Sequence, residues 1–357
     1  MRIAFYTPYL DTVGGGEKYI LTAASYLSTN HVVDVLLDIH LASLNLDSIK
    51  KGIADLHNLD LSRVNFVKAP LGKGSLPFSR LLFLKKYDFL FYLTDGSIFY
   101  STAKNSILHL QSPIKNVNNG IWGKFKLSSW KIIIYNSNFT KEGAQKTWGK
   151  PGIVVYPPIS VEDLKPLKKK KQILSVGRFF GFLKDKKHGF LIDTFKKLVS
   201  ENNLYDWSLY LVGGAGEGDR LYVEELNKLA EGSSIFIHPN LPFHDLKNLY
   251  GESSIYWHAA GFGEEDLTKM EHFGISTVEA MAGGAVPVVI NLGGQPEIVE
   301  QGINGFLWNS ENEFLRYTKD LINDSKLMNK LSREAIKRSK EFSKEKFCEN
   351  ILELVSK

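Results

Sequence analysis

The sequence predicts an α/β protein built from two doubly wound domains. A length of 357 residues suits two domains of ordinary size. Two successive series of short apolar strands alternate with helical patterns, and a polar stretch separates them. The composition, with 43% hydrophobic and 23% charged residues, excludes disordered, collagen-like and coiled-coil classes. Ligands of such sheets bind at the carboxyl ends of the strands, so the expected site is a cleft between the domains.

The first series opens with a strand–turn–helix–strand pattern. Arg2–Tyr6 predicts a buried strand, the glycines at 14–16 a turn, apolar residues at helical spacing a helix, and His31–Leu37 a second strand. Four further strands are expected at Tyr87–Leu93, Ser106–Leu110, Ile132–Tyr135 and Ile153–Tyr156. The polar stretch Lys165–Lys171 is interpreted as a linker, so the predicted domains are residues 1–160 and 166–340.

The second series repeats the alternation. Its expected strands are Ile173–Val176, Trp207–Val212, Ile235–His238, Ile255–His258 and Val286–Ile290. Its expected helices are Gly189–Val199, Ser276–Met281, Pro296–Glu300 and a charged helical segment from Glu311 to the end.

Charge is unevenly distributed. The net charge is +5, but residues 61–150 alone carry fourteen Lys/Arg against three acids. Leu61–Tyr87 has six basic residues and no acid, and its Leu76–Lys86 portion mixes them with aliphatic and aromatic side chains. This mixture suits an anionic membrane surface, although a solvated basic face beside a buried helix is the alternative. Nothing resembles a nucleic-acid-binding motif.

Other sequence features bear on where the protein works. The longest apolar stretches, such as Phe89–Leu93, are far shorter than the roughly 20 residues of a membrane-spanning helix. The N-terminus does not resemble a signal peptide. The single cysteine, Cys348, fits a reducing compartment. We therefore expect a cytoplasmic protein, with peripheral attachment to the inner face of a membrane as one option.

The segment from Glu271 to Glu279 holds the strongest chemical signal. Glu271 precedes a predicted helix, Gly274 permits close backbone approach, and Ser276 with Glu279 has the spacing of a capping box. The helix start after a glycine would also present free N–H groups to a phosphate. A carboxylate one turn into the helix could accept ribose hydroxyls, and a carboxylate in the preceding loop could hold sugar hydroxyls. Local chemistry leaves the capping and binding interpretations open.

An ordered set of motifs makes a resemblance specific. The pair Glu271 and Glu279 is similar to the paired-glutamate motif of retaining glycosyltransferases of family 4. Phe-Gly follows the first glutamate after one residue, and Ala-Met directly follows the second. The supporting motifs are Gly14–Lys18, Tyr135–Thr140, Tyr156–Pro158, Val176–Phe180, Gly293–Val299 and Asn304–Leu307. The resemblance runs from residue 1 to about residue 310 and implies a GT-B fold, in which two Rossmann-like domains face a cleft. It also implies that a last helix, about 340–357, returns to the N-terminal domain.

The resemblance assigns roles on the donor side. Glu279 matches the ribose-binding glutamate, and Glu271 matches the glutamate near the donor sugar. The backbone of Phe273, Gly274, Ile275 and Ser276 would touch sugar and phosphate. Arg178 matches the diphosphate-binding arginine; the alternative for it is a surface salt bridge. Its partner lysine matches Lys186, with Lys187 as the alternative. Gly15 or Gly16 would approach the phosphates from the other domain.

The acceptor side is matched less closely. Asp95 follows a strand and could hold the acceptor hydroxyl or simply start a turn. Many relatives have a histidine two residues before the proline that is Pro113 here, but Gln111 occupies that position and His109 lies four residues before it. This departure leaves open whether His109 or Gln111 takes the catalytic role, and His109 could also be a core residue.

These assignments lead to a functional prediction. We expect a retaining hexosyltransferase that moves a sugar, with a preference for mannose, from a GDP- or UDP-sugar to a glycan, polysaccharide or lipid-linked acceptor. No Asp-x-Asp motif and no zinc-type Cys/His spacing occurs, so Arg178 and Lys186 are expected to replace a metal and no cofactor is expected. The alternatives are a non-catalytic nucleotide-sugar-binding protein of the same fold and a nucleotide-sugar epimerase.

Overall fold

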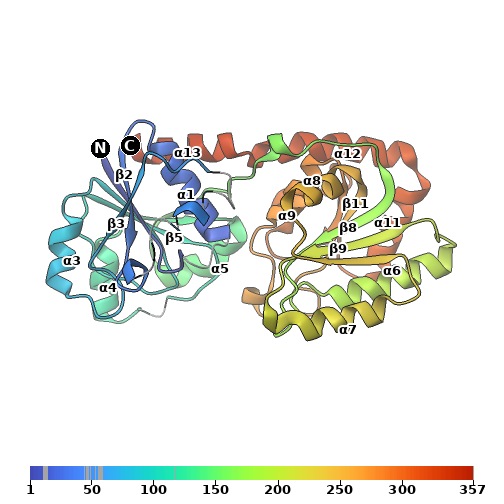
Figure 1. Cartoon of the computed structure of the whole chain (residues 1–357), viewed down its shortest axis with the longest axis horizontal. Coiled ribbons are helices and arrows are strands. Elements are labelled where there is room, and N and C mark those ends of the chain that lie inside the picture. Colours follow the sequence, from blue (N-terminus) through green and yellow to red (C-terminus); the bar gives the residue numbers. More distant parts are fainter. Residues whose placement is uncertain are drawn as a thin grey trace. The chain divides into compact units, whose positions relative to one another are not determined.

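The computed structural model describes residues 1–10, 15–43, 45, 48, 50–52, 54, 59–116 and 118–356 (Figure 1). The chain divides into two compact units. The first comprises Met1–Pro158 and Glu345–Lys357, and the second comprises Ile159–Lys344. Within the described ranges, no helix combines the length and apolarity that crossing a membrane requires.

The first unit is a parallel sheet in the order β3-β2-β1-β4-β5-β6-β7. Its strands are β1 (Arg2–Tyr6), β2 (Val32–Leu37), β3 (Val64–Lys68), β4 (Phe89–Leu93), β5 (Asn105–Leu110), β6 (Ile132–Tyr135) and β7 (Gly152–Val154). Its helices are α1 (Gly15–Leu27), α3 (Pro77–Leu84), α4 (Ile121–Ser128), α5 (Asn138–Trp148) and α13 (Lys344–Ser356), with a 3₁₀ turn at Leu41–Ser43.

Successive side chains of β1 enter opposite core layers. Ile3 and Phe5 join a core cluster that contains residues of α1 and α13, whereas Ala4 and Tyr6 join a cluster that contains residues of α3, α4 and α5. This alternation is the period-two geometry of a strand covered on both faces. The first unit is therefore doubly wound, as the sequence predicted.

The second unit is a parallel sheet in the order β10-β9-β8-β11-β12-β13. Its strands are β8 (Lys170–Val176), β9 (Ser208–Gly213), β10 (Ile235–Pro239), β11 (Ser253–His258), β12 (Val286–Ile290) and β13 (Phe306–Trp308). Its helices are α6 (His188–Asn202), α7 (Arg220–Ala230), α8 (Phe243–Glu252), α9 (Ile275–Ala282), α10 (Gln295–Ile298), α11 (Glu311–Asn323) and α12 (Ser325–Ser339). Short 3₁₀ turns occupy Val161–Asp163, Glu217–Asp219, Leu267–Lys269 and Lys340–Phe342.

Two parts of the fold differ from what the sequence predicted. Val64–Lys68, to which no strand was assigned, is β3 at the edge of the first sheet. Its polar residues Asn65 and Lys68 are exposed, so this strand lacks a continuous apolar run. The supposed linker Lys165–Lys171 belongs to the second unit, and its last two residues begin β8. Lys169 donates from Nζ to the carbonyl oxygens of Ser253 (2.8 Å) and Gly283 (2.6 Å), which fixes this segment to the unit.

Candidate active site

The second unit brings its predicted donor-binding residues to one edge of the sheet. In a doubly wound sheet, ligands bind outside the carboxyl ends of the strands where the strand order reverses. Here that point lies between β8 and β11. Arg178 follows the end of β8 by two residues, and His258 is the last residue of β11. Both lie where the topology favours a ligand.

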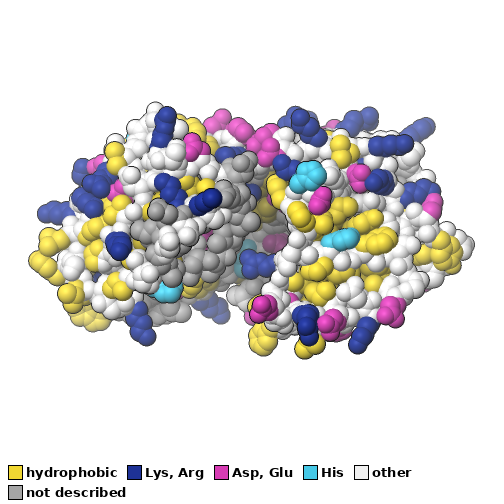
Figure 2. All heavy atoms as spheres, viewed as in Figure 1, with side chains coloured by type: hydrophobic (Ala, Val, Ile, Leu, Met, Phe, Trp, Pro, Cys, Tyr) yellow, Lys and Arg dark blue, Asp and Glu magenta, His cyan; other side chains and the backbone are white. Residues whose placement is uncertain are grey.

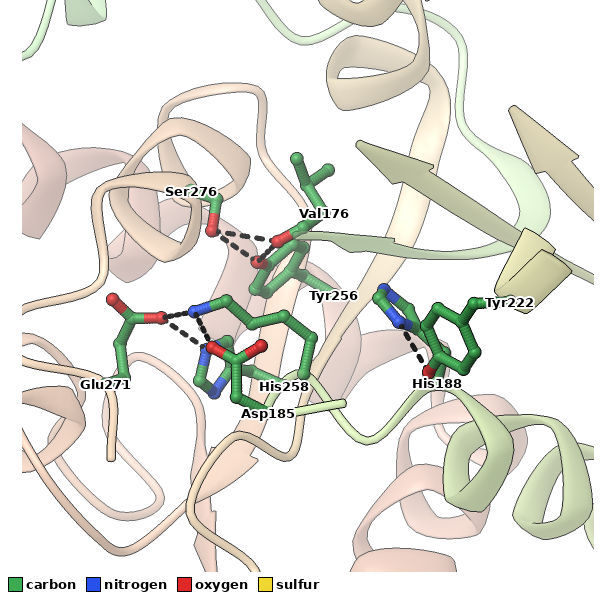
Figure 3. A network of polar contacts seen from close by, with 9 residues as sticks. Val176, Asp185, His188, Tyr222, Tyr256, His258, Glu271 and Ser276 are labelled. Carbon is green, nitrogen blue, oxygen red and sulfur yellow. Dashed lines mark hydrogen bonds and ion pairs between the residues drawn. The ribbon is translucent and has the colours of Figure 1, made fainter. Parts of the chain in front are cut away.

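A polar network that includes Glu271, His258 and Asp185 lies near these strand ends (Figure 3), and the ion pair between Lys186 and Glu271 is at its centre. The Lys186 Nζ lies 2.8 Å from Glu271 Oε2, and both side chains are about one-fifth exposed, at 23% and 21%. The His258 Nε2 lies 3.1 Å from the same carboxylate oxygen, and Asp185 Oδ2 lies 3.7 Å from the ammonium. Lys186, which is 85 residues away in sequence, and His258, which is 13 residues away, therefore both contact the Glu271 carboxylate.

The network keeps Glu271 and Lys186 charged. Burial alone would raise the pKa of Glu271, but the attraction of Lys186 and the hydrogen bond with His258 outweigh it, so this pKa lies well below its usual value. Burial alone would lower the pKa of Lys186, but Glu271 and Asp185 outweigh it, so that pKa is raised. Arg178 is close enough to oppose part of this rise. The site thus offers two cations at the end of β8.

The structure separates the two candidate lysines. The aliphatic part of Lys186 lies over Gly177, where an added Cβ would approach Lys186 Cγ to 2.8 Å. Lys187 has a left-handed backbone, with φ at +57°, and its Nζ lies 2.6 Å from Glu264 Oε1. Lys186, not Lys187, therefore shares the network with Glu271 and the neighbourhood of Arg178.

Arg178 differs from these lysines in being exposed. Within the described part of the chain its guanidinium makes no ion pair or hydrogen bond, so the salt-bridge alternative has no support. An exposed cation with no anionic protein partner is available to an anionic ligand.

The loop that carries Glu271 is held by two glycines that sequence reasoning matched to the family without assigning a role. The Gly294 N–H donates to Glu271 O at 2.8 Å. Gly293 has φ at +65°, and a Cβ there would lie 2.2 Å from Glu271 O. A Cβ on Gly294 would lie 2.5 Å from Phe273 Cα. Only glycine lets these two backbones approach, so this pair sets the position of Glu271.

The capping-box interpretation of Ser276 is wrong. The N-cap of α9 is Gly274, with φ at +120°, and Ser276 lies inside the helix. Its hydroxyl accepts from Tyr256 OH at 2.8 Å and lies 3.3 Å from Val176 O (Figure 3). The side chain thus fastens α9 to β8 and β11. No acceptor for the backbone N–H groups of Ile275 and Ser276 occurs among the described residues, as is usual in the first turn of a helix.

Glu279 lies one turn further along α9. Its Oε2 accepts a 2.8 Å hydrogen bond from the hydroxyl of Tyr250, which is fully buried. This contact orients the carboxylate, and Glu279 does not form the capping interaction that its spacing from Ser276 allowed. Phe273, the remaining donor-side residue, is buried, with its ring 5.5 Å from that of Phe342; only its backbone can reach a ligand.

A second histidine in Figure 3 belongs to the core of this unit. His188 at the start of α6 stacks on Phe179, with ring centroids 4.6 Å apart, and its Nδ1 lies 3.3 Å from Tyr222 OH. Burial lowers the pKa of His188 to about 4. His188 is therefore neutral and packs in the core beside Phe179, which follows the end of β8.

The first unit has its own switch point between β1 and β4. Tyr9 follows β1 and Asp95 follows β4, and the Tyr9 hydroxyl donates to Asp95 Oδ2 at 3.0 Å. The Ser97 N–H donates to Asp95 Oδ1 at 2.9 Å, which is the geometry of the turn alternative. Burial would raise the pKa of Asp95, but the hydrogen bonds from Ser97 and Tyr9 hold it below its usual value. Asp95 is exposed and ionised, so its carboxylate remains accessible to a ligand even though it also forms the turn.

His109 does not fit direct contact with substrate. Its ring is 1% exposed and stacks on Tyr19 with centroids 4.0 Å apart. Burial lowers the pKa of His109 to about 3. Its Nε2 lies 3.0 Å from Gln111 Nε2, and a Cβ on Gly16 would lie 2.8 Å from Gln111 Oε1. Gln111, half-buried beside the start of α1, is the more accessible of the two candidates.

The remaining predicted residues lie at the start of α1. Gly15 is exposed and Gly16 half-buried in its first turn. Gly14, the first glycine of the motif, lies outside the described residues. In the described part of the chain, no group of three His, Cys, Asp or Glu side chains is arranged to hold a metal ion.

Comparison with known proteins defines the class. The family described as Glycosyl transferases group 1 matches residues 159–338, a little over half of the chain. The chain therefore belongs to this glycosyltransferase family. The matched region contains the Arg178, Lys186, Glu271 and Glu279 positions.

Two curated relatives share one name, GDP-Man:Man(3)GlcNAc(2)-PP-Dol alpha-1,2-mannosyltransferase. The human protein is 30% identical over an alignment of 262 positions that covers 64% of this chain and 51% of the relative. The Dictyostelium discoideum protein is 24% identical over 437 residues, covering 99% of this chain and 84% of the relative. The chain thus spans about half the length of the human relative it matches.

Solved structures confirm the GT-B fold. Anabaena HepE in complex with UDP and glucose is 18% identical, with a TM-score of 0.72 and coverage of 100% of this chain and 99% of the other. A glycosyltransferase of Rickettsia africae is also 18% identical, with a TM-score of 0.74 and coverage of 99% and 97%. Assignment to family 4 and the individual residue roles stay predictions.

Proposed function

We propose that the chain is a retaining hexosyltransferase that transfers mannose from GDP-mannose to a lipid-linked glycan. The observation that carries this proposal is the arrangement at the end of β8. There an exposed Arg178, the charged Lys186 and the free N–H groups at the start of α9 surround the switch point of the second sheet. Such a set of donors suits the diphosphate of a nucleotide sugar.

The proposed chemistry follows from these charges. When the bond between the anomeric carbon and the phosphate oxygen breaks, negative charge develops on the leaving diphosphate. Arg178 and Lys186 would stabilise it, and the acceptor hydroxyl would attack from the same face while the leaving phosphate receives its proton. No metal is needed in this scheme.

Glu271 would act as an anion beside the sugar. Its pKa is held well below the usual value, so it is ionised and accepts hydrogen bonds from sugar hydroxyls. Its negative charge would also favour positive charge on the sugar ring in the transition state. His258 contacts this carboxylate and would fix its orientation.

Glu279 would bind the ribose. The buried Tyr250 hydroxyl donates to Oε2 of this carboxylate and so orients it, one turn into α9. The choice of mannose, of GDP and of a lipid-linked acceptor rests on the names of the curated relatives. A lipid-linked acceptor also requires that the protein work at a membrane surface.

Thermal-shift measurements with GDP, UDP and ADP in EDTA test the donor site. We expect GDP to raise Tm most, because a ligand that binds only the folded state stabilises it. Arg178→Gln should reduce this shift, whereas Arg333→Gln, at another exposed arginine that pairs with none of the described acidic residues, should not. A GDP shift that requires Mg²⁺, or one unaffected by Arg178→Gln, would contradict the proposed site.

Turnover separates the enzyme from the alternatives. With GDP-mannose and a lipid-linked glycan, we expect GDP release and an α-linked product by NMR. Arg178→Gln should lower kcat by roughly a hundredfold with Tm unchanged. Nucleotide binding without turnover would favour the non-catalytic alternative, and a changed free nucleotide sugar without acceptor would favour an epimerase. A β-linked product would exclude retention.

A further inference from the structure

The first unit carries an apolar surface on α3 and α4. Large apolar side chains of these helices are between 54% and 81% exposed. They are Leu76, Phe78 and Leu82 at α3, and Ile121, Trp122 and Phe125 at α4. In Figure 2 hydrophobic side chains gather over this part of the unit. We call these six residues the α3–α4 ridge.

The ridge is one continuous surface although its two halves lie about 40 residues apart in sequence. The segment after β4 joins them. The Thr102 hydroxyl donates to Leu81 O at 2.5 Å on the α3 side. On the α4 side, Tyr100 stacks on Phe125 with centroids 4.9 Å apart. A groove of about 510 Å³ is lined by Phe78 and Leu82 of α3 and by Tyr100, so Tyr100 contacts both this groove and Phe125 of α4.

The two segments that form the ridge contain basic residues and no acidic ones. Leu76–Lys86 and residues 120–129 carry Arg80, Lys85, Lys86, Lys124 and Lys126 and no Asp or Glu. Lys85 and Lys124 are exposed and form no ion pair with any described residue. These ammonium groups are thus available to an external anion.

We propose that the α3–α4 ridge docks the protein on an anionic lipid bilayer. Aromatic and aliphatic side chains flanked by lysines enter the interface between headgroups and acyl chains, while the lysines meet lipid phosphates. A second copy of the chain fits less well, because a symmetric contact through this surface would bring the exposed Lys85 and Lys124 close to the same cations of the copy. Charge complementarity therefore favours an anionic membrane over a second copy of the chain as the partner of the ridge.

Vesicle co-sedimentation without nucleotide tests the proposal independently of the proposed reaction. We expect binding to phosphatidylcholine vesicles that contain phosphatidylglycerol, and little binding to phosphatidylcholine alone. The double variant Phe78→Ser/Trp122→Ser should lower the partition coefficient by roughly tenfold or more. Tyr205→Ser/Leu221→Ser, which removes two equally exposed side chains from the second unit, should leave binding unchanged.

The lysines have their own matched control. Lys85→Gln/Lys124→Gln should weaken binding by roughly tenfold or more. Lys228→Gln/Lys319→Gln, at exposed lysines of the second unit, should have only a small effect. Since all eight positions are at the surface, the Tm of each variant should stay near that of the wild type.

Three results would overturn the proposal. The first is no wild-type binding to the anionic vesicles. The second is equal loss of binding in the ridge variants and their controls. The third is a wild-type dimer in light scattering that Phe78→Ser/Trp122→Ser converts to a monomer, which would make the ridge an interface between copies. None of these results depends on the donor site.

Discussion

A double-mutant cycle on Lys186 and Glu271 would measure how strongly the centre of the candidate site is coupled. At 2.8 Å and an effective dielectric constant of about 20, the two charges attract by about 6 kcal/mol. Removing them from water offsets much of this, although each side chain keeps about one-fifth of its exposure. We therefore expect a net coupling of about 1–3 kcal/mol.

The cycle uses Lys186→Met, Glu271→Gln and the double variant, with free energies of unfolding from urea titrations. Lys186→Met should destabilise by about 2–4 kcal/mol, because it leaves Glu271 charged and partly buried. The double variant should cost less than the sum of the single ones by the coupling energy.

An exposed pair in the same unit supplies the control. Lys197 Nζ and Glu311 Oε1 are 3.0 Å apart, but both side chains are more than 40% exposed, at 42% and 41%. Their coupling should be clearly smaller, because water screens an exposed ion pair. If the Lys186–Glu271 coupling is no larger than this, the two side chains do not form the coupled unit inferred here.

Three other changes have defined outcomes. Gly293→Ala should destabilise by roughly 1–2 kcal/mol more than Gly302→Ala in urea titrations, because both have positive φ but only the first Cβ meets backbone; equal effects would contradict the clash. Burial lowers the pKa of Lys169 from 10.5 to about 7, so the unfolded state binds more protons between these values and stability should rise with pH across that window. Lys169→Met should flatten this rise; an unchanged profile would rule out Lys169 as its source. Tyr250→Phe should raise the Kd for GDP several-fold in calorimetry, because Glu279 loses its buried hydrogen-bond donor. An unchanged Kd would contradict the proposed role of Glu279 in nucleotide binding.

Strand prediction succeeded where burial left a continuous apolar run. The predicted limits of β1, β6 and β12 agree with the structure, and β12 is buried along its whole length. It failed at β3, because an edge strand alternates polar residues with apolar ones and here includes a lysine. It also took Lys169 for part of a linker, since its sequence neighbours are charged whereas its partners are carbonyls more than 80 residues away.

The predicted site shows the same division. The motifs that follow β8 and precede α9 were sufficient to predict a nucleotide-sugar site from the sequence. Choosing between Lys186 and Lys187 required the structure, because adjacent residues in a loop can point to different partners, here Glu271 and Glu264. The misassigned cap at Ser276 has a similar cause, because its partner Tyr256 lies on a neighbouring strand.

The sequence by itself determined the doubly wound architecture and the family, because apolar periodicity and ordered motifs are local properties of the chain. Only the tertiary structure decided which charges meet, that Gly293 and Gly294 support the Glu271 loop, and that the sides of the α3–α4 ridge form one surface. These features join residues separated by about 20 to 85 positions. Contacts over such separations are set by how helices pack on the two sheets, and no local pattern encodes them.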